Sequence, residues 1–139
     1  TNPRKGYDMA NRMEEPIRAL GKRFVIVAGS FAPNGDSAIA ATSNKGKGFT
    51  VAYTSTGLYT ITFTDKWTDL VSFTVTKQVA TGDDTFLQAG TYDASARTIT
   101  IRNWDVSQPG VLDIAANANN RVHFCAIFRN TSIAGGTSA

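Results

Sequence analysis

The sequence contains few of the residues that usually carry catalysis or hold metals. Its 139 residues include one histidine and one cysteine, and charged side chains make up only 18% of the chain. A single cysteine excludes an internal disulfide framework and suits a reducing compartment or assembly inside a cell. No apolar run approaches the roughly 18 residues of a membrane span, and no secretory signal pattern stands at the start. We therefore expect no membrane partner.

Positive charge is concentrated at the N-terminus. The formal net charge is +3. Residues 1–23 hold six basic and three acidic side chains, whereas the rest of the chain holds eight of each, so the first segment carries the whole surplus. Because the remainder is neutral and has no basic stripe, we expect that nucleic acid is not the main partner.

Residues 1–21 lack the alternation of a strand, and we expect them to form an extended N-terminal arm. Two prolines and two glycines interrupt this segment, although a few apolar residues keep near-helical spacing. The segment is either an arm that reaches another subunit or protein, or a frayed terminus. The residues predicted to bind a partner are Arg4, Lys5, Tyr7, Met9, Arg12, Met13, Ile17, Arg18 and Leu20.

Residues 46–63 have the pattern of a β-hairpin, which we expect at the centre of the sheet. In the second half Tyr59, Ile61 and Phe63 share one face, and mainly threonines occupy the other, as the period of two in a strand requires. Gly57 can adopt the left-handed conformation that a short connection between the two strands needs.

The remaining chain is rich in short strands separated by turns. Residues 24–28 form an uninterrupted apolar run, which predicts a strand buried on both faces. Further strands are predicted over residues 37–42, 70–79, 85–92, 97–106, 111–114 and 121–129. This pattern predicts an all-β, antiparallel β-sandwich or jelly-roll-like body over residues 22–132, followed by a flexible C-terminal tail over 133–139.

His123 and Cys125 are the most suggestive pair for chemistry. They stand two apart on one strand, so both side chains leave the same face, as in a Cys–His nucleophile pair or half of a metal site. No carboxylate lies nearby in sequence to orient the imidazole. We therefore interpret Arg121, His123, Cys125 and Ile127 as a face that packs against a second sheet or a neighbouring subunit, and we expect no catalytic, cofactor-binding or metal site.

A pair of adjacent aspartates and a set of aromatic residues near loops are two further candidates for binding. Asp83 and Asp84 are adjacent in a predicted turn, but they lack the spacing of a calcium-binding loop. Four aromatic residues in or near predicted loops are candidates for stacking on sugar rings or bases, or for anchoring an interface. These four residues are Phe31, Trp67, Tyr92 and Trp104.

Three stretches together resemble the head decoration, or cement, proteins of tailed bacteriophages. They are VIVAGSFAPNG at 25–35, GKGFTVAYTSTGLYTITFTDKW at 46–67 and RVHFCAIFRNTS at 121–132. The segment RMEEPIRALGKR at 12–23 shares the resemblance less clearly. The same threonine-rich texture is also similar to trimeric phage fibre tips and to trimers like tumour necrosis factor.

The resemblance implies a structural virion protein without cofactor or catalysis. It implies a homotrimer at three-fold or quasi-three-fold positions on the outer surface of the capsid, assembled in the host cytoplasm. The major capsid protein is the implied partner, and the arms clamp neighbouring capsid subunits.

The alternative is a trimeric phage fibre or a receptor- or glycan-binding module that uses the loop aromatics. A small hydrolase is a third possibility, which the missing nucleophile–base set disfavours.

Overall fold

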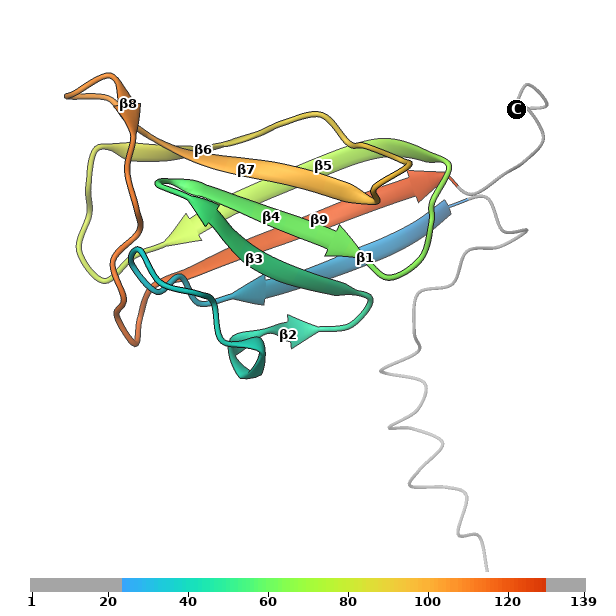
Figure 1. The fold of residues 1–139 in the computed structure, drawn as a ribbon, viewed down its shortest axis with the longest axis horizontal. Coiled ribbons are helices and arrows are strands. Elements are labelled where there is room, and N and C mark those ends of the chain that lie inside the picture. The colour runs from blue at the N-terminus through green and yellow to red at the C-terminus, as the bar shows by residue number, and fades with distance from the viewer. Residues whose placement is uncertain (1–23, 130–139) are drawn as a thin grey trace, which may run out of the picture.

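The computed structural model describes residues 24–129, which form a sandwich of two antiparallel β-sheets (Figure 1). This confirms the predicted all-β antiparallel sandwich. The predicted arm and tail, with all the arm residues named above, lie outside the described range. Within that range no helix is long and apolar enough to cross a membrane.

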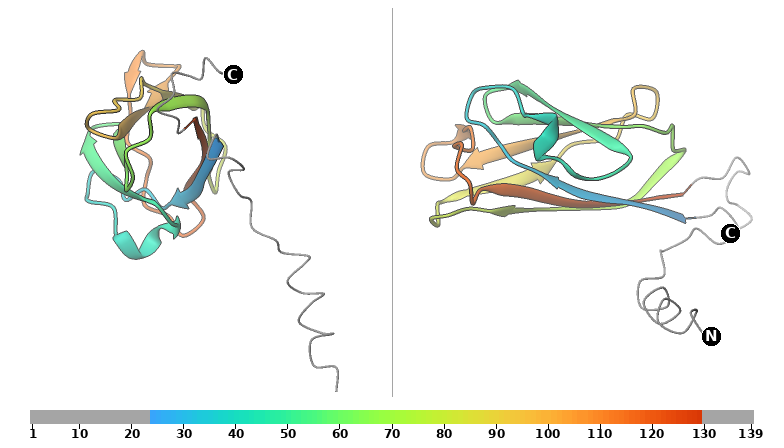
Figure 2. Two further views of the ribbon diagram at one scale, coloured as in Figure 1. Left: turned by 90° about the vertical axis from the view of Figure 1, so that its right-hand side faces the viewer. Right: turned by 90° about the horizontal axis from the view of Figure 1, so that it is seen from below.

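The two sheets face each other across one core (Figure 2). Sheet A contains, in order, β2 (Lys45–Gly46), β1 (Phe24–Phe31), β9 (Arg121–Arg129) and β5 (Asp69–Gln78). Sheet B contains β3 (Phe49–Ser55), β4 (Leu58–Phe63), β7 (Thr98–Asp105) and β6 (Thr85–Ala89), and β8 (Gly110–Val111) pairs with β7. A single 3-10 turn, η2 (Ala41–Ser43), precedes β2.

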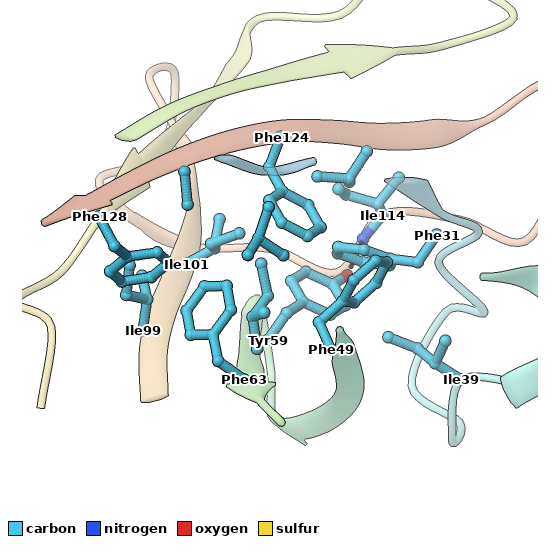
Figure 3. Close-up of a cluster of buried hydrophobic side chains, with 14 residues drawn as sticks. Phe31, Ile39, Phe49, Tyr59, Phe63, Ile99, Ile101, Ile114, Phe124 and Phe128 are labelled. Carbon is cyan, nitrogen blue, oxygen red and sulfur yellow. Dashed lines mark hydrogen bonds between the residues drawn. The ribbon is translucent and has the colours of Figure 1, made fainter. Parts of the chain in front are cut away.

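Alternating side chains of β4, β7 and β9 fill the core (Figure 3). Every second residue of these strands is buried, as the period of two predicts. The rings of Phe63 and Phe128 meet edge to face with centroids 4.8 Å apart, and those of Phe49 and Phe124 do so at 4.7 Å. This geometry places the positive edge of one ring against the negative face of the next, which stabilises the pair beyond the burial of its area.

The hairpin forms as predicted, but its position in the sheet differs. Phe49 pairs with Phe63 and Tyr53 with Tyr59, and Gly57 has a φ of 67° in the turn. A β-carbon on Gly57 would also lie 2.7 Å from the backbone nitrogen of Leu112. However, β3 is the edge strand of sheet B, because β4 pairs with β7 on its other side. The hairpin is therefore not the centre of the sheet.

The prediction that residues 24–28 are buried on both faces is wrong. Phe24 is 50% and Ile26 is 41% exposed, whereas Val27 is only 7% exposed. Sheet B covers one face of β1, and no other layer of the described structure covers the opposite face. An apolar run therefore behaves as an alternating strand whose outward side chains happen to be apolar.

The strand predicted over residues 37–42 is also wrong. Ser43 donates its hydroxyl to the carbonyl of Ala40 at 2.7 Å and accepts from the amide of Ala32 at 3.2 Å. Such local bonds between side chain and backbone compete with strand pairing and favour turns. The strands predicted over 85–92 and 111–114 form but are shorter, ending at Ala89 and Val111.

We expect Phe63→Ala to reduce the free energy of unfolding by about 3–5 kcal/mol, because it opens a cavity among packed rings. Phe86→Ala is the matched control, since Phe86 is 50% exposed, and its cost should be within about 0.5 kcal/mol. Chemical denaturation of both variants measures the two values. Equal losses would contradict the assignment of the core.

Candidate functional site

The outer face of sheet A carries the four residues predicted to form an interface. Arg121, His123, Cys125 and Ile127 alternate with the buried residues of β9, so they share one face, as predicted. That face points away from sheet B, because the buried residues of β9 fill the space between the sheets. The interpretation that it packs against a second sheet is therefore wrong for the described part of the chain.

One end of this outer face is apolar. The register places Ile26 of β1 beside Ile127 of β9, with Phe24 at the start of β1. A bulge in β5 between Leu70 and Ser72 interrupts the pairing with β9, and Val71 within it is 49% exposed. We call Phe24, Ile26, Val71 and Ile127 the outer-face patch. It lies where β1 begins and β9 ends (Figure 1).

An ion pair borders the outer-face patch. The guanidinium of Arg129 donates to the carboxylate of Asp69 at 2.5 Å, and both side chains are partly exposed. The pair joins the end of β9 to the start of β5, next to the exposed apolar side chains. The charges at this border are therefore mutually neutralised, which leaves the patch itself uncharged.

The rest of the outer face of sheet A is polar and shallow. The Nε2 of His123 lies 3.0 Å from the Oε1 of Gln78, so an amide, and not a carboxylate, contacts the imidazole. Half-buried Cys125 and exposed His123 border a hollow of about 180 Å³. The guanidinium of Arg121 donates to the carbonyl of Ser43 at 2.6 Å, which ties η2 to the sheet. In residues 24–129 no group of three or more His, Cys, Asp or Glu side chains could hold a metal ion.

A larger hollow lies at the opposite end of the sandwich. This loop-end pocket has a volume of about 330 Å³ and lies between the segment that follows β5 and the segment that follows β8. It is lined by Val79, Ala80, Thr81, Asp83, Thr85, Asn103, Leu112, Asp113, Ile114, Ala115, Asn117 and Asn120. Carboxylates and amides thus line the pocket together with apolar side chains.

A buried lysine supports this end of the sandwich. Lys77 occupies an inward position of β5, and its side chain is only 8% exposed. Its ammonium group donates to Asp83 at 3.0 Å, to Asn103 at 3.2 Å and to the hydroxyl of Thr85. Burial by itself raises the pKa of Asp83, but the hydrogen bonds from Lys77 and Thr85 outweigh it and hold that pKa below 3.8.

The second wall of the pocket is attached to the β3–β4 hairpin. The amide of Gly57 donates to the carboxylate of Asp113 at 2.6 Å, and the hydroxyl of Tyr53 donates to the same carboxylate at 3.3 Å. The amide of Ile114 donates to the hydroxyl of Tyr59 at 3.0 Å. Burial raises the pKa of Tyr59 to about 12, so this phenol stays neutral and holds the segment in place at physiological pH.

Sequence reasoning missed this pocket, although two signals for it were present. Lys77 continues the inward row of Phe73 and Val75 on β5, and Asn103 continues the inward row of isoleucines on β7. A polar residue at an inward position requires a hydrogen-bond partner. Asp83, predicted only as a turn residue, is that partner for Lys77.

The four aromatic candidates occupy different places. Phe31 ends β1 beside a loop, but it is fully buried in the core and so is not available to stack on a ligand or to anchor an interface. Trp67 stacks on Phe128 at a centroid distance of 6.0 Å, and Tyr92 donates its hydroxyl to the carbonyl of Trp67 at 2.9 Å. Trp104 lies opposite Phe86 in the register, on the outer face of sheet B. Its indole nitrogen donates to Gln88 at 2.7 Å.

No family model, no curated protein and no solved structure matches this chain.

We expect Asp83→Asn to weaken the fold at neutral pH and to reduce its sensitivity to acid. The variant leaves buried Lys77 without a charged partner, at a cost of about 1–3 kcal/mol. Because the fold lowers the pKa of Asp83, its stabilising effect is present above the ordinary carboxyl pKa and is lost as the pH falls through the lowered value. Melting temperatures measured between about pH 2 and pH 7 test both expectations.

Asp84→Asn is the control for this measurement, because it changes the adjacent exposed carboxylate without touching Lys77. It should retain the acid sensitivity of the unmodified protein. An Asp83→Asn variant with the same melting temperature as the unmodified protein across the whole range would contradict the role assigned to this ion pair.

Proposed function

We propose that this chain is a structural protein of a bacteriophage virion that decorates the outer surface of the capsid. In this proposal it associates with copies of itself as a homotrimer, and residues 1–21 bind the major capsid protein. It uses no cofactor and catalyses no reaction.

The outer-face patch is the observation that carries this proposal. Large exposed apolar side chains gathered on one surface mark sites that another protein covers. Phe24, Ile26 and Val71 are each between 41% and 50% exposed, and Ile127 lies among them. The outer face of sheet B, in contrast, is mainly threonine, with Thr60 pairing Thr100 and Thr62 pairing Thr98. Sheet B also exposes Phe86 opposite Trp104, but sheet A gathers three exposed apolar side chains beside Ile127.

The composition of the N-terminal segment supports the proposed binding of residues 1–21 to the major capsid protein. It carries the net positive charge of the chain and an apolar stripe, and it precedes the strand that begins at the outer-face patch. A trimer presents three such segments, and several modest contacts on one shell reinforce one another through their high effective concentration. The resemblance to phage decoration proteins agrees with this arrangement.

A trimeric fibre or a receptor-binding module is the second candidate. The observation that favours it is the loop-end pocket, which lies at the end of the sandwich away from Phe24 and Arg129. The number of copies in purified particles separates the candidates, because decoration needs hundreds of copies and a fibre needs a handful.

We expect the isolated protein to be a homotrimer in light scattering. Ile26→Glu should give a monomer, because it places a charge in the apolar contact between copies. Phe86→Glu is the matched control, since Phe86 is equally exposed but lies on sheet B, and it should stay trimeric. A stable monomer of the unmodified protein at micromolar concentration would contradict the proposal.

Deletion of residues 1–20 should leave the melting temperature nearly unchanged, because the core lies within residues 24–129. The same deletion should sharply reduce binding to empty capsids. Joint replacement of Arg4, Lys5, Arg12 and Arg18 by Ala should have a smaller effect that depends on salt, since surface charges are screened over about 8–10 Å at ordinary ionic strength. Equal binding by the truncated and the full-length protein would show that the sandwich carries the whole interface.

A further inference from the structure

The six exposed large apolar side chains of residues 24–129 divide between the two ends of the sandwich. Phe24, Ile26 and Val71 belong to the outer-face patch, and the other three are Phe86, Val106 and Leu112. The second group lies where β5 has ended, β6 begins and β7 ends, which is also the end that holds the loop-end pocket (Figure 1). Leu112 belongs to both sets, because it lines the pocket and is 46% exposed.

From this arrangement we infer that the loop-end pocket is a binding site for a neutral saccharide. Its volume of about 330 Å³ is at the lower end of the roughly 300–1,000 Å³ of pockets that hold small molecules. This size suits one sugar ring of a longer glycan. The inference does not depend on whether the chain decorates a capsid or belongs to a fibre.

The charges around the pocket disfavour anionic ligands. Asp83 and Asp113 both line it, so an anion would meet two carboxylates. The ammonium of Lys77 is bonded to Asp83, Thr85 and Asn103, which leaves it engaged with the protein. Among the residues described, no group of three or more His, Cys, Asp or Glu side chains could hold a metal ion.

The polar groups of the pocket match hydroxyl groups. Each carboxylate oxygen can accept more than one hydrogen bond, and the Tyr53 hydroxyl lies a rather long 3.3 Å from Asp113. Asn117 uses its side-chain oxygen to accept from the amide of Asn119 at 2.8 Å, and its amide NH₂ remains a potential donor. A sugar hydroxyl both donates and accepts, so one hydroxyl can bond to a carboxylate and to an amide together.

Apolar side chains also line the pocket, on both of the segments that form it. Val79, Leu112 and Ile114 line it, and Ile114 is buried whereas Leu112 reaches solvent. A pyranose ring has hydroxyls at its rim and a face of C–H groups. A small pocket lined by both polar and apolar groups suits such a ligand, because its hydroxyls and its C–H groups can each find a partner there.

The walls are held in position before any ligand arrives. Asn120 accepts from the amide of Ala80 at 2.8 Å and donates to the carbonyl of Ala115 at 3.0 Å, so one buried side chain joins the two segments that form the pocket. The bonds from Gly57 to Asp113 and from Ile114 to Tyr59 attach the same wall to the hairpin. A preformed site binds with less loss of conformational freedom.

Titration of the full-length, isotope-labelled protein with galactose, glucose, mannose and N-acetylglucosamine tests the inference by nuclear magnetic resonance. We expect at least one of these sugars to shift the amide signals of residues 79–85 and 112–117 in a saturable way, with a Kd of about 1–10 mM, as befits a single ring. Galacturonate is the matched anionic ligand. It should bind at least about five-fold more weakly than galactose because of the two carboxylates.

Two asparagines in one loop provide a matched pair of variants. Asn117→Ala removes a lining amide and should weaken sugar binding at least about five-fold. Asn119→Ala changes a neighbour that does not line the pocket and should leave binding within about two-fold. Unchanged binding in the Asn117→Ala variant would overturn the inference, and so would shifts that map to the Trp104 face of sheet B.

The inference is also overturned if none of the four sugars produces a saturable shift up to about 50 mM. Trimer formation and capsid binding are measured separately on the same protein. If no sugar binds, the proposed function is not contradicted. If the protein is a monomer but binds sugar, the saccharide site is not contradicted.

Discussion

Edge-to-face packing of aromatic rings between β4 and β9 is the contact on which the sandwich depends. Phe63 of β4 meets both Phe124 and Phe128 of β9, and Phe49 of β3 meets Phe124 from the side. These rings fill the space between the sheets, so the inner face of each strand has to present apolar residues. The requirement determines which face of every strand points inward, and hence which residues remain for the outside.

Toward the end of the sandwich that holds the loop-end pocket, the apolar filling gives way to polar groups. The inward-facing residues of β5 and β7 end with Lys77 and Asn103. The ammonium group of Lys77 donates hydrogen bonds to both Asn103 and Asp83. A buried ammonium group is tolerated only with such partners. The same polar groups hold apart the segments that would otherwise collapse on the core. The loop-end pocket is therefore a consequence of how the core ends.

The outer faces of the two sheets carry different side chains, and packing of the core does not explain this difference. Threonines line the outer face of sheet B along β3 and β4, where Thr54 and Thr60 approach to 2.6 Å between hydroxyl oxygens. Sheet A presents the outer-face patch beside the start of β1. Burial in the core demands nothing of outward residues, so apolar side chains there require another explanation. The proposed contact with a copy of the chain supplies one.

Local alternation in the sequence by itself determined the strands, the hairpin turn at Gly57 and the buried faces of β4, β7 and β9, because a period of two is a property of the strand alone. Only the tertiary structure decided that β3 is an edge strand and that the apolar run of β1 is half exposed, since both depend on which layers lie alongside. The tertiary structure also decided which residues come together around the pocket. Lys77 and Asp83 come from one part of the chain and Asn103 and Asp113 from another, and only the stacking of two sheets with their connecting loops brings the two parts together.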